Sequence, residues 1–258
     1  MRRMSKPVNP DSEARRPAPD ARKERWRKHR QARRAEFVDA AIRALGKHGP
    51  DVGMDDIAAE AGVTKPVLYR HFTDKADLYL AVGHRGTELL FQRLVPALNT
   101  ETAPRPRIKQ SLTAFFSVID EFPNVYRFIT GRHLPAESDV VHEDKEMIAA
   151  ALATLLGDYM RAFNMDSGGA EPWAHGIVGL VQNTADWWLD RQSMSREAVV
   201  DYLTQIIWAA IDGILRDAGA TVDPDAPFEL PGEAHLHAVP EPAETERETT
   251  RSSGGASA

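Results

Sequence analysis

The chain of 258 residues contains no cysteine. This absence excludes disulfide bonds, zinc sites with thiolate ligands and a cysteine nucleophile, and it fits a protein of the reducing cytoplasm. We also find no apolar run near ~18 residues, so we expect no membrane span. The basic N-terminus is not followed by the short apolar segment of a secretory signal. We therefore expect a cytoplasmic protein.

Motifs for catalysis are absent as well. The sequence has no glycine-rich phosphate loop, no Gly-x-Ser-x-Gly nucleophile and no His-Glu-x-x-His metal pair. An all-α enzyme is therefore only a distant alternative, and we expect no cofactor and no metal ion. No segment has the alternating pattern of a strand, whereas apolar residues recur at helical spacing through most of the chain. This periodicity predicts an all-α fold.

Charge is distributed unevenly along the chain, although the net charge is only −6. Residues 1–34 hold 13 lysines and arginines against 4 acidic residues, and residues 220–258 hold 2 against 8. We expect residues 1–24 to form a disordered basic arm and residues 220–258 a disordered acidic tail. Contact with DNA and simple solubilisation are both compatible with the arm.

The stretch from Met54 to Phe72, MDDIAAEAGVTKPVLYRHF, has the pattern of two short helices joined by a tight turn. Gly62 can adopt the left-handed backbone conformation that ends a helix. Thr64 then occupies an N-cap position, where its hydroxyl can accept a hydrogen bond from a backbone N–H, and Pro66 fits the first turn of the next helix. This pattern predicts a helix-turn-helix, whose second helix enters the major groove. The alternative is an ordinary pair of antiparallel helices with a solvated polar face.

Hydrogen-bond donors are dense on and around the second helix of this motif. We expect Lys65, Pro66 and Arg70 to lie nearest to base edges, and the remaining donors to contact phosphates. A supporting helix is expected to begin at about Trp26 or Arg30. The predicted DNA-binding residues are Arg33, Arg34, Thr64, Lys65, Pro66, Tyr69, Arg70, His71 and Lys75.

Residues 33–80 resemble the DNA-binding domain of TetR-family transcriptional regulators. The resemblance rests on a helix that ends near Gly49 and on the motifs Ile57-Ala58, Ala61-Gly62-Val63-Thr64, Leu68-Tyr69, His71-Phe72 and Lys75. The family usually has Ser or Thr as the cap of the second helix, and Gly53 stands there in this chain, so a phosphate contact through that hydroxyl is expected to be missing. The resemblance implies a DNA-binding domain over residues 25–80. It also implies a helical domain over residues 81–219 that binds a small molecule and dimerises.

A helix from Lys75 to about Leu98 is expected to join the two halves. Gly83 and Gly86 interrupt its middle, and glycine within a helix costs roughly 1 kcal/mol relative to alanine. Two interpretations remain open: close packing against a neighbouring helix, and a soft point at which the DNA-binding half is re-aimed.

Two long apolar helices are expected near residues 172–192 and 195–219. The resemblance implies that they pair with their copies in a homodimer. A palindromic operator in double-stranded DNA also needs two recognition helices, because its half-sites lie about 34–36 Å apart. The other interpretation is that both apolar stripes face the core of their own bundle. The predicted dimer residues are Trp188, Leu203, Ile207, Ile211 and Ile214.

The second half is rich in aromatic side chains, which favours a pocket for an elongated or planar apolar effector, for example a fatty-acid-like molecule. Arg127 is the residue that we expect to meet a carboxylate. The leading hypothesis is a repressor that such a ligand releases from its operator, and the alternative is an activator or a DNA-binding protein without an effector. The predicted ligand-binding residues are Phe116, Arg127, Tyr159, Asn183 and Trp187.

Overall fold

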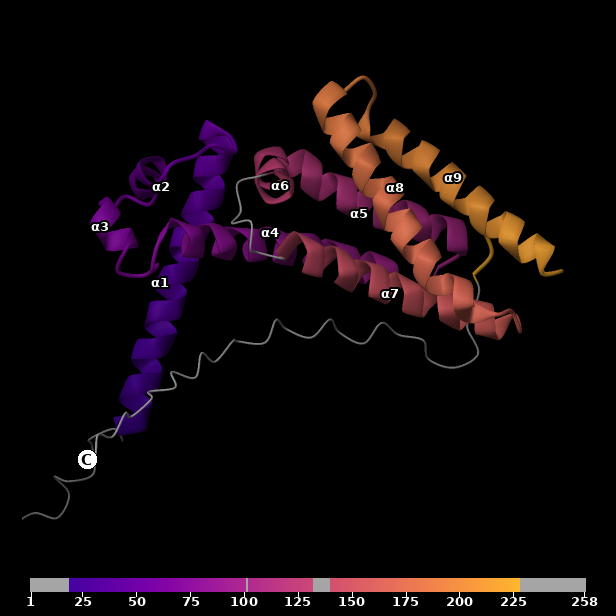
Figure 1. The fold of residues 1–258 in the computed structure, drawn as a ribbon, viewed down its shortest axis with the longest axis horizontal. Helices are drawn as coiled ribbons and strands as arrows, with labels where there is room; N and C mark the ends of the chain where they lie inside the picture. The colour runs from indigo at the N-terminus through magenta and orange to yellow at the C-terminus, as the bar shows by residue number, and fades with distance from the viewer. Residues whose placement is uncertain (1–18, 101, 132–139, 228–258) are drawn as a thin grey trace, which may run out of the picture.

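The computed structural model describes residues 19–100, 102–131 and 140–227; the expected basic arm up to residue 18 and the acidic tail from residue 228 lie outside these ranges. All regular structure in the described ranges is helical, which confirms the all-α prediction. In Figure 1 the first three helices gather at one end, and α4 runs from them into a bundle of the later helices. The elements are α1 (Pro19–His48), α2 (Met54–Glu60), α3 (Lys65–Leu68), α4 (Lys75–Leu98), α5 (Pro104–Glu121), α6 (Pro123–Thr130), α7 (Val140–Ala162), the 3-10 turn η2 (Ser167–Gly169), α8 (Ala170–Arg191) and α9 (Arg196–Asp217).

Helix α1 begins earlier than we expected. It starts at Pro19, where a proline in the first turn costs no hydrogen bond, so residues 19–24, which we had assigned to the disordered arm, are helical. Every side chain from Arg25 to Arg33 is exposed, and this part of α1 projects beyond α2 and α3 (Figure 1). Only the second part of the helix, from Phe37 onward, faces a core.

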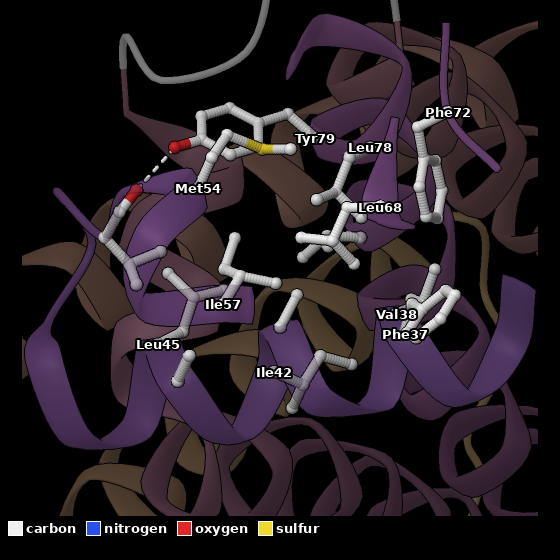
Figure 2. Packing of buried hydrophobic residues seen from close by; sticks show 14 of the residues in the cluster. Phe37, Val38, Ile42, Leu45, Met54, Ile57, Leu68, Phe72, Leu78 and Tyr79 are labelled. Carbon is white, nitrogen blue, oxygen red and sulfur yellow. Dashed lines mark hydrogen bonds between the residues drawn. The ribbon is translucent and has the colours of Figure 1, made fainter. Parts of the chain in front are cut away.

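The core of the end formed by α1–α3, which the sequence predicts to bind DNA and which we call the DNA-binding end, is built around α1 (Figure 2). Phe37, Ile57 and Leu68 are each no more than 1% exposed, and burial of such a side chain stabilises the fold by roughly 1.5–3 kcal/mol. The Tyr79 hydroxyl donates a 2.5 Å hydrogen bond to the carbonyl of Val52, which holds α4 to the loop before α2 (Figure 2).

Helix α6 also belongs to this core, although it lies far beyond residue 80 in the sequence. Its Val125 and Phe128 are buried there, and the Phe128 ring packs edge-on to Tyr79 at 4.8 Å between centroids. A Cβ added at Gly86 of α4 would overlap Ile129 of α6 and lie 3.1 Å from Val125. This close approach favours the packing interpretation of the α4 glycines.

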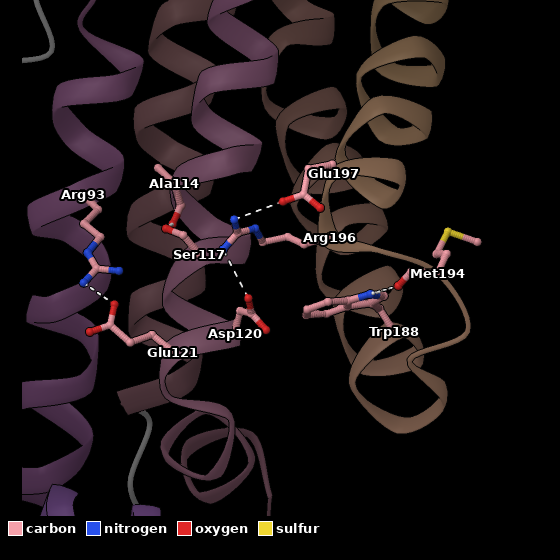
Figure 3. A network of polar contacts seen from close by, with 9 residues as sticks. All are labelled: Arg93, Ala114, Ser117, Asp120, Glu121, Trp188, Met194, Arg196 and Glu197. Atoms are coloured by element: carbon pink, nitrogen blue, oxygen red, sulfur yellow. Dashed lines mark hydrogen bonds and ion pairs between the residues drawn. The ribbon is translucent and has the colours of Figure 1, made fainter.

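A second core fills the bundle between α5, α8 and α9. Polar contacts at one end fix these helices relative to each other (Figure 3). Arg196, at the start of α9, lies 3.2 Å from Asp120 of α5 and 3.1 Å from Glu197, and the Trp188 indole donates to the Met194 carbonyl at 3.0 Å. An ion pair between Arg93 and Glu121, at 2.5 Å, joins α4 to α5.

Residues 220–225, which we had placed in the disordered tail, form a strap across the start of α5. The backbone N–H of Arg105 donates to the Pro224 carbonyl at 3.1 Å, and the Arg105 guanidinium pairs with Asp225 at 2.7 Å. We call residues 220–225 the C-terminal strap.

Helix α9 is long and apolar enough to cross a membrane by length and composition alone, with a mean hydropathy of 1.4. In this fold it is a bundle helix instead, because Val199, Leu203 and Ile207 are buried against α5 and α8. An ion pair of 2.7 Å between Asp201 of α9 and Lys109 of α5 also joins these two helices. Packing within the bundle therefore accounts for much of its apolar composition.

Candidate nucleic-acid interface and effector cavity

The turn between α2 and α3 has the geometry that the sequence predicted. Gly62 has a φ of +65°, and the N–H of Val63 donates to the Ala58 carbonyl at 3.0 Å. At the start of α2 the N–H of Gly53 donates to Asp56 at 3.0 Å, so a carboxylate holds the helix start even though the cap residue has no side chain. The helix-turn-helix is thus closed by local hydrogen bonds.

Helix α3 is a single turn that continues to Phe72 through further backbone bonds, including Phe72 N–H to the Leu68 carbonyl at 3.0 Å. Thr64 occupies the N-cap position as expected, but its hydroxyl makes no capping hydrogen bond. The exposed hydroxyl is therefore free of this role and available to a phosphate. Leu68 and Phe72 are buried and fix which side of α3 faces outward.

The outward side of α3 carries Tyr69, which is 44% exposed, and Arg70, whose exposed side chain has no hydrogen-bond partner among the described residues. Lys65 pairs with Asp55 of α2 at 3.1 Å, but both side chains are largely open to solvent. Such a surface pair is weak and exchanges readily for a phosphate. Lys75, at the start of α4, lies 4.7 Å from the Tyr79 ring centroid.

Arg34 is engaged inside the domain rather than presented to DNA. Its guanidinium bonds both carboxylate oxygens of Asp77, at 2.5 and 3.2 Å, and the His71 carbonyl at 2.8 Å. It also stacks over the Phe72 ring, 4.2 Å from the centroid. The Arg34 guanidinium holds the pKa of Asp77 below its usual range. A direct phosphate contact by Arg34 would have to compete with these bonds, so the geometry favours a positioning role.

His71 is also turned partly inward, with its ring edge-on to Phe37 at 5.1 Å. Its Nδ1 is buried and has no hydrogen-bond partner among the described residues. Burial, followed by the nearby charges of Arg30 and Arg33, lowers the pKa of His71. The imidazole is therefore neutral at neutral pH and could meet a phosphate only as a hydrogen-bond donor.

The projecting part of α1 adds positive charge beside α3. Arg33 pairs with Glu36 at 2.5 Å and lies 5.1 Å from the Phe37 ring, while Arg30 and Arg25 are exposed about one and two turns earlier. Dense positive charge next to a recognition helix suits the phosphate backbone of DNA.

A cavity of about 220 Å³ lies in the bundle, lined by residues of α4, α5, α7, α8 and α9 and by Val222 of the C-terminal strap. Its walls are leucine, isoleucine and aromatic side chains, among them Trp173 and Trp208. Tyr159 lines it as predicted, but Phe116, Arg127, Asn183 and Trp187 are not among the lining residues.

These four residues point elsewhere for separate reasons. Phe116 is buried in the second core, 5.7 Å from the Trp188 ring. Arg127 donates to the Leu189 carbonyl at 2.9 Å at the end of α8. Asn183 and Trp187 do share one face of α8, but that face is the exposed one.

Two polar residues of the cavity, Arg107 and Ser111, were not among the ligand-binding residues predicted from the sequence. Arg107 donates to the Tyr159 hydroxyl at 2.6 Å, and both Arg107 Nε and Ser111 Oγ are buried without a hydrogen-bond partner among the described residues. Arg107 and Ser111 are four residues apart, so they share a face of α5 beside its apolar stripe. This spacing was the signal in the sequence that could have identified them.

The predicted dimer residues face inward. Trp188, Leu203 and Ile207 are at most 5% exposed, in the core of their own bundle, and Ile211 and Ile214 line the cavity. The large apolar side chains on the outer face of α8 and α9 are different ones: Leu180, Trp187, Tyr202 and Ile206.

Comparison with known proteins agrees with this architecture. Residues 37–82 match the family model described as bacterial regulatory proteins, tetR family, and residues 93–221 match the tetracyclin repressor-like C-terminal domain. An uncharacterized HTH-type transcriptional regulator of Mycobacterium tuberculosis is 38% identical over 202 residues, which is 78% of this chain and 86% of that protein. The HTH-type transcriptional activator FasR of Mycolicibacterium smegmatis is 31% identical over 187 residues, which is 72% of this chain and 85% of FasR.

Solved structures share the fold at lower identity. A tetR-family transcriptional regulator from Streptomyces coelicolor has a TM-score of 0.59 and 21% identity, covering 73% of this chain and 86% of its own. The transcriptional regulator FadR from Bacillus subtilis, in complex with stearoyl-CoA, has a TM-score of 0.57 and 15% identity, covering 67% and 96%. The helix-turn-helix, the helical bundle and both family matches lead to one conclusion: the chain belongs to the TetR family of DNA-binding transcriptional regulators, which are not enzymes.

Proposed function

We propose that the protein is a homodimeric, cytoplasmic regulator that binds a palindromic operator through α3 and leaves it when a small apolar ligand occupies the bundle cavity. The observation that carries this proposal is the position of the cavity. Leu94 and Leu98, at the far end of α4, form part of its wall, and the first turn of the same helix adjoins the helix-turn-helix.

Repression is our leading proposal for the direction of control. Activation remains the alternative, because FasR, at 31% identity, is named an activator. Both directions use the same physical event, a ligand-dependent change in operator affinity.

The size of the cavity supports a mechanism. At about 220 Å³ it is smaller than the roughly 300–1,000 Å³ typical of ligand sites, so a ligand with a long chain has to push the surrounding helices apart. Such a ligand binds the widened state more tightly, and that difference shifts the population away from the state that binds DNA. A preference of about 100-fold corresponds to ~2.7 kcal/mol of coupling.

Two routes carry this displacement to the DNA-binding end. The first is α4 itself. The second is α6, which contributes Val125 and Phe128 to the DNA-binding core. Its Tyr126 donates to Asp186 of α8 at 2.8 Å, and burial, reinforced by the Asp186 charge, raises the pKa of Tyr126 and keeps the phenol a donor. A shift of α8 therefore pulls on α6.

The dimer in this proposal forms through the outer face of α8 and α9. Tyr202 and Ile206 lie one helical turn apart and are 64% and 54% exposed, so this face offers an apolar contact surface to a second copy. Nothing lies within 4 Å of the Cβ positions of Gly176 and Gly213, so a partner helix could approach closely there.

The test is operator selection from random duplexes, followed by fluorescence anisotropy in the presence of long-chain acyl compounds. We expect release of the operator at ligand concentrations that also change tryptophan fluorescence. Leu152→Trp, which fills the cavity from α7, should abolish the response, and Thr154→Trp, exposed on the same helix, should not. Release by a small polar metabolite, with no response to any apolar compound, would contradict the proposal.

A further inference from the structure

We propose that the effector is a carboxylic acid whose carboxylate is bound by Arg107, Ser111 and Tyr159 at the strap end of the cavity. This inference rests on the proposed function and adds the chemical class of the ligand and the position of its head group.

Arg107 is the only charged residue among those that line the cavity. A guanidinium beside apolar walls is costly unless a counter-ion accompanies it, and no carboxylate pairs with Arg107 among the described residues. Other arginines of the same half are paired: Arg93, Arg105 and Arg161 have carboxylate partners at 2.5, 2.7 and 2.5 Å. Arg191 also has no carboxylate partner among the described residues, but it is exposed to water at the end of α8. Arg107 is thus the unpaired arginine that lies inside the bundle, at the cavity.

The hydrogen bonds of Arg107 leave capacity for a ligand. Its Nη1 donates to the Tyr159 hydroxyl at 2.6 Å, and its Nη2 makes a long bond of 3.5 Å to the Thr102 carbonyl. Its Nε is buried with no partner, and so is the Ser111 hydroxyl one helical turn further along α5. A buried donor without a partner costs free energy that an acceptor on a ligand would recover.

A carboxylate matches these donors. It offers two oxygens that accept only, and a guanidinium can bond both of them in parallel. With the head group at Arg107, an apolar tail would extend along α5 toward Phe115 and Gln182 at the other end of the lining. A thioester such as an acyl-CoA has no charge at the acyl carbon, so it would leave the guanidinium without a counter-ion.

The experiment compares four compounds that share one chain: hexadecanoic acid, its methyl ester, its alcohol and its CoA thioester. Binding to the full-length protein is followed by calorimetry and by tryptophan fluorescence, since Trp173 and Trp208 line the cavity. We expect the acid to bind about tenfold or more tightly than the ester and the alcohol. Arg107→Gln should remove this preference, so that the acid and the ester bind with similar affinity.

Arg161→Gln is the matched control, because Arg161 lies on α7 near Tyr159, pairs with Asp158 and is not part of the lining. Equal affinity for acid and ester in the unaltered protein overturns the carboxylate inference and leaves the apolar effector intact. Tightest binding of the thioester, unaffected by Arg107→Gln, overturns it in the same way. Binding of none of the four compounds overturns the apolar effector as well. If Arg107→Gln does not fold, the acid–ester comparison on the unaltered protein and Ser111→Ala decide the question.

Discussion

Arg34 and Arg70 of the DNA-binding end are in opposite situations. Arg34 is held by Asp77, by a backbone carbonyl and by an aromatic ring, whereas the side chain of Arg70 is exposed and has no hydrogen-bond partner in the described part of the chain. A side chain that makes no bond within the protein loses nothing when it turns to DNA. We therefore expect replacement of Arg34 to lower the stability of the fold and replacement of Arg70 to lower the affinity for DNA.

Replacement of Arg70 tests base recognition. If Arg70 meets a base, Arg70→Ala should cost about 1–3 kcal/mol of operator affinity and relax specificity at one position in each half-site. Lys75→Ala should weaken binding to all sequences alike and reduce the slope of log affinity against log salt by about one. Anisotropy titrations against the operator and point-substituted duplexes measure both effects. A uniform loss for Arg70→Ala would assign it to the phosphate backbone instead.

Replacement of Arg34 tests the internal contact. Arg34→Ala and Asp77→Asn should each lower the free energy of unfolding by about 1–2 kcal/mol, because a partly buried, charge-assisted pair is lost. The double variant should lose less than the sum of the two. Urea unfolding of the wild type, the two single variants and the double variant measures these free energies. Additive losses would mean that the two side chains do not interact in solution.

His71 should make stability depend on pH. Burial lowers its folded-state pKa below the ordinary value of 6.5, so the unfolded state binds more protons as the pH falls through this range. Stability should therefore be fully present above pH ~6.5 and decline below it. His71→Gln should flatten the dependence between about pH 7 and pH 5, as followed by urea unfolding, with His84→Gln, an exposed histidine of α4, as the control. An identical pH profile in His71→Gln would place the effect elsewhere.

At the scale of elements, two short segments connect the parts of the molecule. Helix α6 has only eight residues, yet it packs into the DNA-binding core and bonds to α8 through Tyr126 and Arg127. The C-terminal strap lines the cavity with Val222 and is held by Arg105.

Loosening the strap should change the rates of ligand exchange. Asp225→Ala removes the 2.7 Å ion pair with Arg105, so ligand association and dissociation should both accelerate severalfold while the equilibrium affinity changes less. Stopped-flow tryptophan fluorescence with an acyl ligand measures these rates. Asp217→Ala, an exposed carboxylate at the end of α9, is the control. Unchanged rates in Asp225→Ala would show that ligands enter by another route.

At the scale of the whole molecule, substitutions at two adjacent isoleucines of α9 can distinguish an effect on folding from an effect on dimerisation. Ile206 is 54% exposed on the outer face, whereas Ile207 is 5% exposed in the core. A carboxylate is costly in either apolar contact, but the consequences should differ.

Ile206→Glu should give folded monomers that lose operator binding, because two recognition helices are no longer joined. Ile207→Glu should instead lower the melting temperature, since it places a charge in the core of one chain. Sedimentation and thermal unfolding distinguish the two, and Gln205→Glu adds the same charge as a control. A wild-type protein that is monomeric at micromolar concentration would remove the basis of this prediction.

Local signals explain what could be read from the sequence. Gly62 at the turn and the full span from Lys75 to Leu98 depend on bonds between residues at most a few positions apart, and both are confirmed. The all-α fold and the helix-turn-helix follow from the same kind of information, because caps, turns and helical periodicity act within one or two turns of the chain.

Pairing across long separations could not be read in this way. Arg34 meets Asp77 from 43 residues away, and Arg105 meets Asp225 across 120. The spacing of Asn183 and Trp187 predicted a shared face, but only the packing of α7 and α9 on α8 decided that this face is the outer one. The same packing buried Leu203 and Ile207, left Ile206 outside, and put the unpaired Arg107 at the cavity. Helical periodicity defines the faces of a helix, and the neighbouring helices determine which face is buried.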